Sequence, residues 1–409
     1  MLVRVTSVFI LLALPTHSAR RLTTTTLADG ASDLTVHEWG TFTTVAGEDG
    51  HAIDWLPLGG PTDLPCFVER FQNRADVKLS PTQPTPLDYT SARSSLWGKV
   101  RMETPVLYFY TKRPGNVNVR VRFPRGLMTE WYPRATVSQP LVDRTTLRRA
   151  PRESVIEWRN VNVVPNAPRH FPVDVGESHY YAARNTDAVP LVVDGLSERF
   201  LFYRGVASFD VPLSAVALGN GRVRVRNLGA DALPALVLFE NRDGVIRYRA
   251  HGALSGETVV ALPTRVGSAT RVRRDLERML VAAGLYPKEA AAMVESWRDS
   301  WFEEGTRVFY IIPPRAVDAI LALTVEPVPT HVARVFVGRM EVITPATQRS
   351  VENAVAANDA TILERYGRFL GPITDRMLAR HPDSVTAAHI QKVRGATFTS
   401  FLHRVSACE

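Results

Sequence analysis

The sequence predicts a mainly β protein of the α+β class, an antiparallel β-sandwich or a partly closed barrel that is followed by helices. Two observations support this prediction. From residue 34 to about 265, short apolar runs are separated by Gly, Pro and Asn turns, which is typical of antiparallel β folds. After residue 268, apolar residues recur every three or four positions, which indicates helices that bury one face.

The strand signal is clearest in two segments. In 117–123, valines alternate with polar residues, and the apolar run 106–110 and the turn 114–116 precede them, which predicts a β-hairpin. In 222–226, valines alternate with arginines after the turn 219–221. Further strands are expected at 36–45, 155–164, 200–203, 236–240, 246–250 and 258–262. Long loops are expected at 60–98, 138–152 and 165–176.

The helical part begins with a predicted helical hairpin. Its first helix ends at Gly284, and its second begins at Pro287 and ends near Gly305, residues that suit these termini. Strands are then expected to return before a helical tail that Pro345 opens. The expected strands are 306–312, 322–326 and 332–344, and the expected helices are 346–357, 360–369 and 373–380.

The start of the chain predicts export. A single Arg4 precedes the apolar run 8–14, and small residues lead to Ala19, which is the layout of a signal peptide. The run is too short to span a bilayer, which requires roughly 20 apolar residues. We therefore expect a secreted or periplasmic protein. Its expected parts are a signal peptide (1–19), a flexible leader (20–33), a β-rich domain (34–265), a helical hairpin with returning strands (268–345) and a helical C-terminal region (346–409).

The charge pattern disfavours nucleic acid as a partner. The formal net charge is +8, but the arginines are spread along the chain and interleaved with acidic residues. Nucleic-acid-binding proteins usually cluster their basic residues on one face. The sequence also lacks a P-loop, a dinucleotide fingerprint after a strand and a G-x-S-x-G elbow. We therefore expect no nucleotide partner, and a polysaccharide or another envelope component is the expected partner.

The two cysteines leave two alternatives open. Cys66 and Cys408 are far apart in sequence, and an oxidising compartment would allow them to pair. Such a bond would hold the C-terminus against the fold. Two separate thiols are the other alternative, because the sequence does not give the Cα distance that a disulfide requires.

Three segments resemble a group of exported bacterial proteins. They are HEWGTFT at 37–43, RMETPVLYFY at 101–110 and ESWRDSWFEEGT at 295–306. The resemblance covers about residues 36–345. It implies export and a bacterial origin, and it assigns no catalytic role to any residue.

The segment His37-Glu38-Trp39 is the first candidate site. In a strand, Glu38 shares a face with Val36 and Phe42, whereas His37 and Trp39 share the opposite face. A carboxylate on an apolar face is costly unless it is paired or functional. Glu38 is therefore either a catalytic acid or one half of a buried Glu–Arg pair.

Two further Glu-Trp pairs suggest a site for sugars. They are Glu130-Trp131, which Tyr132 follows, and Glu157-Trp158. Sugar-binding clefts combine aromatic rings with carboxylates. However, the Glu and Trp of a pair point to opposite faces of a strand, and Trp is also an ordinary core residue.

The predicted helix at 287–304 carries an acidic stripe. Glu295, Asp299 and Glu303 recur every fourth residue, opposite an apolar stripe of Met293, Trp297 and Trp301. Like charges at this spacing repel by ~0.2–0.5 kcal/mol per pair, which Arg298 relieves only in part. The acidic stripe is therefore expected to face an Arg cluster, a metal ion or a substrate.

The segment 178–181 supplies a second histidine. His179, beside Tyr180, could act as a general base or as a metal ligand. Metal sites usually require three or more ligands, and neither H-x-x-x-H nor C-x-x-C spacing occurs. No cofactor is therefore predicted, and a metal ion bound by His37 and His179 remains an alternative.

These candidates give three functional hypotheses. The first is acid–base chemistry on carbohydrate or another envelope polymer. The second is an envelope binding or structural protein without catalysis, and the third is a metal-dependent enzyme. A pocket with convergent acids would favour the first hypothesis, and scattered acids would favour the second. The catalytic candidates are Glu38, Glu130, Glu295, Asp299 and His179, and the binding candidates are His37, Trp131, Tyr132, Tyr180 and Arg298.

Overall fold

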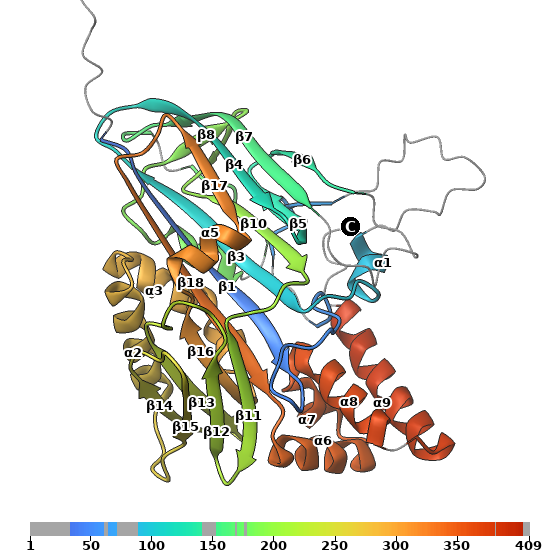
Figure 1. The fold of residues 1–409 in the computed structure, drawn as a ribbon. Coiled ribbons are helices and arrows are strands. Elements are labelled where there is room, and N and C mark those ends of the chain that lie inside the picture. Colours follow the sequence, from blue (N-terminus) through green and yellow to red (C-terminus); the bar gives the residue numbers. More distant parts are fainter. Residues whose placement is uncertain are drawn as a thin grey trace, which may run out of the picture.

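The computed structural model describes residues 33–60, 64–71, 89–140, 153–167, 170–175, 178–380 and 382–403. The predicted signal peptide (1–19) and nearly all of the predicted leader (20–33) lie outside the described residues. The described strands form three sheets, and helices pack around the largest sheet (Figure 1). No helix among these residues is long and apolar enough to cross a membrane.

The main sheet has nine strands in the order β14-β13-β16-β18-β1-β3-β10-β5-β2. Neighbouring strands run antiparallel, except for the central pair β1 and β18, which is parallel. The strands are β1 (Thr35–Ala46), β2 (Glu69–Arg70), β3 (Val100–Tyr110), β5 (Gly126–Tyr132), β10 (Leu201–Ala207), β13 (Leu236–Arg242), β14 (Val245–His251), β16 (Gly305–Ile311) and β18 (His331–Val342).

Two smaller sheets cover one face of the main sheet. The core between the layers joins Val36 and Phe42 of the main sheet to Val119, Trp158 and Val225 of the smaller sheets. This arrangement confirms the predicted α+β sandwich. One smaller sheet contains β17 (Ala322–Glu326), β4 (Gly115–Phe123), β7 (Ser154–Val163), β8 (Leu191–Val193), β9 (Leu196–Glu198) and β6 (Thr136–Ser138), and the other contains β11 (Leu213–Gly219), β12 (Arg222–Asn227) and β15 (Glu257–Ala261).

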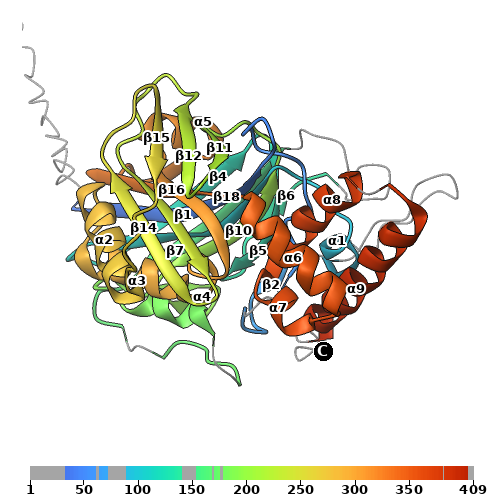
Figure 2. The same ribbon diagram turned by 90° about the horizontal axis from the view of Figure 1, so that it is seen from below.

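Helices cover the opposite face of the main sheet, as the view from below shows (Figure 2). The second core joins Trp39 and Tyr108 of the sheet to Leu276, Met293 and Trp301 of the helices. The predicted apolar stripe with Trp297 therefore packs on the sheet. The helices are α2 (Ala269–Ala282), α3 (Pro287–Ser296), α4 (Arg298–Trp301) and the 3-10 helix η1 (His179–Arg184).

The C-terminal helices pack at one end of the main sheet (Figures 1 and 2). Their core includes Val45 at the end of β1, Trp55, and Ile343 just after β18. These helices are α6 (Pro345–Ala357), α7 (Ala360–Glu364), η2 (Gly367–Phe369), α8 (Leu370–Arg380) and α9 (Ser384–His403). The last of them, α9, lies within the predicted helical C-terminal region (346–409) but beyond the last individually predicted helix (373–380). Two short helices, α1 (Tyr89–Arg93) and α5 (Pro314–Ile320), complete the fold.

The predicted hairpin between 106–110 and 117–123 is wrong. Strand β3 pairs with β1 and β10 in the main sheet, whereas β4 pairs with β7 and β17 in the outer sheet. Burial explains the difference. Residues 100–109 are buried throughout, so β3 must lie inside a sheet that is covered on both faces, whereas β4 alternates between buried and exposed residues and suits an outer sheet.

Two other predictions change in detail. The expected helix 287–304 is interrupted at Trp297, which separates α3 from the single turn of α4. The strands of 34–265 and of 268–345 share one sheet, because β18 lies between β1 and β16.

Candidate functional site

Glu38 is part of a buried ion pair. Its carboxylate accepts hydrogen bonds from Arg334 Nε at 2.6 Å and from the hydroxyl of Tyr203 at 2.5 Å. The Glu38 side chain is fully buried, and that of Arg334 is 7% exposed. Burial is the main cause that raises the pKa of Tyr203 well above its usual value, and the Glu38 charge adds to it. A substrate has no access to Glu38, so the Glu–Arg alternative is the one found.

Glu130 is also buried and saturated with hydrogen bonds. It accepts from the hydroxyls of Tyr89 and Thr129. Its neighbour Trp131 is half-buried and packs against the cores, and Tyr132 is 3% exposed. These residues therefore present no open aromatic surface on which a sugar ring could stack. Trp158 of the other Glu-Trp pair is 1% exposed, so the same holds for it.

The acidic stripe contacts arginines at its C-terminal end. An Arg cluster was one of the three partners expected from the sequence. Glu303 accepts from Arg339 Nη2 at 2.5 Å, and Glu341 binds the Nε of Arg307 at 2.9 Å. Arg307, Arg339 and Glu341 are fully buried. Burial raises the pKa of Glu303 and of Glu341, and it lowers the pKa of Arg339 to about 10. These side chains join the main sheet to α4 and serve the fold.

Four of the predicted site residues meet at the surface. Arg298 donates from Nη1 to Glu295 at 2.7 Å and from Nε to the Nε2 of His179 at 3.1 Å. The same Nε2 lies 2.9 Å from a carboxylate oxygen of Asp299. These four side chains are between 27% and 69% exposed. We call them the His179 cluster.

The two contacts of His179 Nε2 exclude each other. A ring nitrogen that accepts the N–H of Arg298 carries no proton, whereas one that binds Asp299 must donate a proton. A given protonation state of this nitrogen therefore satisfies only one of the two contacts, and Arg298 engages both Glu295 and Asp299. Each carboxylate that could support catalysis here is already paired.

His37 lies elsewhere, on the helix-covered face of β1. Its Nδ1 is 2.8 Å from Glu289, which also accepts from the hydroxyl of Tyr110 at 2.7 Å. None of the described contacts of His37 involves His179. Among the described residues, no three His, Cys, Asp or Glu side chains could together hold a metal ion.

The remaining candidates are structural. Tyr180 is 5% exposed, and its hydroxyl donates to Glu198, which Arg184 also binds. Cys66 is disulfide-bonded, and Cys408, the only other cysteine in the sequence, lies outside the described residues.

A hollow lies on the outer face of β17, β4 and β7. Its volume is about 600 Å³, and it is lined by polar side chains of the three strands together with the apolar Val119, Trp158 and Ala322. Arg120, in the middle strand, lies opposite Glu157 of β7 and Thr324 of β17. Asn118 and Arg122 extend the polar row along β4. The sequence singled out Glu157 of this hollow, as part of a Glu-Trp pair, whereas Asn118, Arg120 and Arg122 stood out only as the polar face of the alternating strand 117–123.

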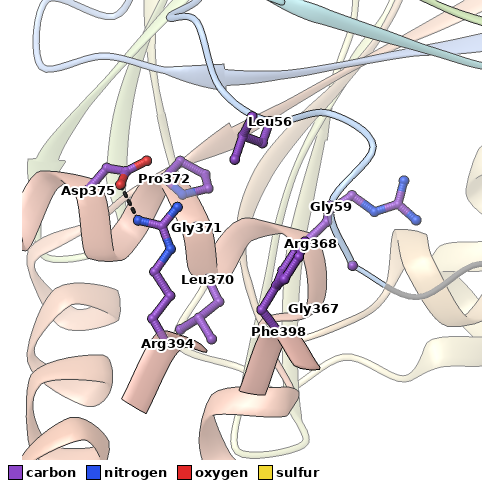
Figure 3. A pocket seen from close by; sticks show the side chains of 11 residues that line it. Leu56, Gly59, Gly367, Arg368, Leu370, Gly371, Pro372, Asp375, Arg394 and Phe398 are labelled. Atoms are coloured by element: carbon purple, nitrogen blue, oxygen red, sulfur yellow. Dashed lines mark hydrogen bonds and ion pairs between the residues drawn. The ribbon is translucent and has the colours of Figure 1, made fainter. Parts of the chain in front are cut away.

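A second hollow lies between the loop at residues 56–60 and the C-terminal helices (Figure 3). Arg394 is paired with Asp375 beside it, and Arg368 of η2 is among its lining residues. Its volume is about 30 Å³, which suits one or two water molecules and excludes an organic ligand.

No protein-family model matches the chain, and no curated protein sequence matches it. Among solved structures, the yeast delta-COP-I mu-homology domain covers 76% of this chain and 97% of its own, at 8% identity and a TM-score of 0.29. The same domain complexed with the Dsl1 WxWxV peptide covers 76% and 98%, at 6% identity and a TM-score of 0.28. At TM-scores below 0.5, these likenesses carry no argument about this chain.

Proposed function

We propose that this protein is an exported component of the bacterial envelope that binds a polysaccharide or another hydroxyl-rich envelope polymer without chemical change. The observation that carries the proposal is the polar hollow on the outer face of β17, β4 and β7. Its volume of about 600 Å³ lies within the usual range for ligand sites, about 300–1,000 Å³.

The chemistry of the hollow suits hydroxyl groups. Guanidinium groups donate hydrogen bonds, carboxylates accept them, and amides do both. Arg120 is 56% exposed and lies 3.4 Å from Glu157, so donors and acceptors stand side by side on one open surface. An open sheet face also lets a long chain pass across it, which an enclosed pocket does not.

The placement of the predicted acids favours binding over acid–base chemistry. Glu38 and Glu130 are both buried and hydrogen-bonded. Glu38 lies on the face of the main sheet that the smaller sheets cover, and Glu130 lies beside α1. Glu295 and Asp299 are held by Arg298 at the surface. These four carboxylates do not converge on one pocket, which a hydrolase that used them as acid and base would require.

The proposal predicts that Arg120→Ala weakens binding to purified cell-wall sacculi. The loss of one charged hydrogen-bond donor should reduce affinity about tenfold or more, as measured by co-sedimentation over a range of sacculus concentrations. Arg224→Ala is the matched control, because Arg224 is an exposed arginine in the middle of β12, outside the hollow.

Unchanged affinity in Arg120→Ala, or an equal loss in Arg224→Ala, would contradict the proposal. An equal loss would show that the basic surface as a whole attracts the sacculi. The release of soluble fragments from sacculi by the wild-type protein would show that it also cleaves its ligand.

A further inference from the structure

A separate polar cavity lies between the β11–β12 turn, the end of β13 and the start of α6. Its volume is about 210 Å³, well above the ~10–15 Å³ that a single water molecule requires. Three arginines from three different elements line it: Arg222 at the start of β12, Arg242 at the end of β13 and Arg349 in α6. We call it the arginine cavity.

The positive charge of this cavity is only partly neutralised. Among the described residues, Glu240 is the one acid that lines it, and its carboxylate binds Arg242 at 2.6 Å. Glu240 also lies 3.6 Å from Arg247 and accepts the hydroxyl of Thr306 at 3.1 Å, so its oxygens are already engaged. Arg222 and Arg349 are exposed and have no acidic partner among the described residues.

The three arginines of the cavity project from regular secondary structure, a β-hairpin, a strand and a helix. Asn220 and Gly221 form the two-residue turn between β11 and β12, and both have positive φ (51° and 67°), as a type I′ hairpin turn requires. Opposite this turn, Thr344 caps the N-terminus of the 13-residue helix α6. Thr344, Pro345 and Ala346 line the cavity, so the positive end of the helix dipole adds to the arginine charges.

We propose that the arginine cavity binds a phosphate group. Guanidinium groups pair with phosphate oxygens through two parallel hydrogen bonds, and three arginines from three elements can reach several oxygens of one tetrahedral anion. The site is independent of the hollow on β4, because it shares no lining residue with it. The phosphate is either a free ion or part of a phosphodiester polymer of the envelope.

Calorimetric titration of the full-length protein with inorganic phosphate tests the site. Arg349→Gln and Arg222→Gln should each weaken phosphate binding about tenfold or more, the fold-change expected when one charged hydrogen bond is lost. Arg226→Gln is the matched control, because Arg226 is exposed on the same strand as Arg222 and does not line the cavity. It should bind phosphate as the wild type does. A melting curve of each variant confirms that the exposed substitutions leave the fold intact.

A second titration, with a glycerol phosphate oligomer, distinguishes the two sources. If the oligomer binds more tightly than inorganic phosphate and displaces it, the site serves a phosphodiester polymer. If only inorganic phosphate binds, the site serves the free ion. If the wild type binds neither ligand, or if Arg226→Gln loses as much affinity as Arg349→Gln, the proposal is overturned. Retained sacculus binding in Arg349→Gln would separate this site from the proposed function.

Discussion

Two of the buried carboxylates are held by arginines that are remote in sequence. Glu38 binds Arg334, and Glu341 binds Arg307 with both side chains fully buried. The removal of two charges from water is costly, so such pairs add little net stability but are expensive to break. This explains why an acid on an apolar strand face was ambiguous in the sequence: the residue that neutralises Glu38 lies 296 positions away.

The titration of Glu303 should make stability depend on pH. Burial raises the pKa of Glu303 above its ordinary value of 4.5, against the opposing charges of Arg339 and Arg307. The folded protein therefore keeps this proton to a higher pH than the unfolded chain does. The contribution of Glu303 to the unfolding free energy is fully present below about pH 4.5 and is lost as the pH rises through the folded pKa.

Melting temperatures check this expectation. They are measured for the wild type and for Glu303→Gln from pH 3.5 upward, over about 4 pH units that include the carboxyl pKa. As the pH rises, the melting temperature of the wild type should fall relative to that of Glu303→Gln. Glu153→Gln should show the opposite slope, because the hydrogen bond from Arg122 lowers the pKa of Glu153. Parallel curves for wild type and Glu303→Gln would contradict the assignment.

At the scale of single elements, the sequence predicted strands well where one face of the strand is exposed to solvent. The alternation in 117–123 and 222–226 corresponds to β4 and β12, and the first helix of the hairpin corresponds to α2. Strands without periodicity were not placed correctly by the sequence pattern. Strand β3 is buried on both faces and carries no alternation, so nothing in its sequence showed that it pairs with β1 and β10 instead of β4.

The turn between β11 and β12 is an element that local sequence does determine. Gly221→Ala should lower the unfolding free energy by about 1 kcal/mol, because Gly221 has a φ of +67° that residues with a Cβ rarely adopt. Gly115→Ala, at the start of β4, is the control: its φ is not in the left-handed region, and a Cβ added there would meet open space. Urea denaturation gives both values. An equal change in the two variants would contradict this explanation.

At the scale of the whole molecule, long-range pairing joins the parts that the sequence separates. All twelve residues of β1 pair with β18, which lies far from β1 along the chain, and β16 lies between β18 and β13. Composition and periodicity change near residue 265, but this change marks the entry of helices into the chain and not the border of an independent unit. Likewise, the residues that line the hollow and the arginine cavity come from elements that only the folded sheets bring together.

A nick in the chain should therefore leave one body. A protease site inserted between Arg265 and Val266, where Val266 is 57% exposed, can be cut without touching a strand. The two fragments should elute together in size-exclusion chromatography and separate only in denaturant, because β16 and β18 of the second fragment fill the sheet between β13 and β1 of the first. The uncut insertion variant is the control. Separation would leave β13, β16, β18 and β1 each with one unpaired edge, which is unfavourable. Separate elution of two folded fragments would therefore show that residues 34–265 form a domain of their own.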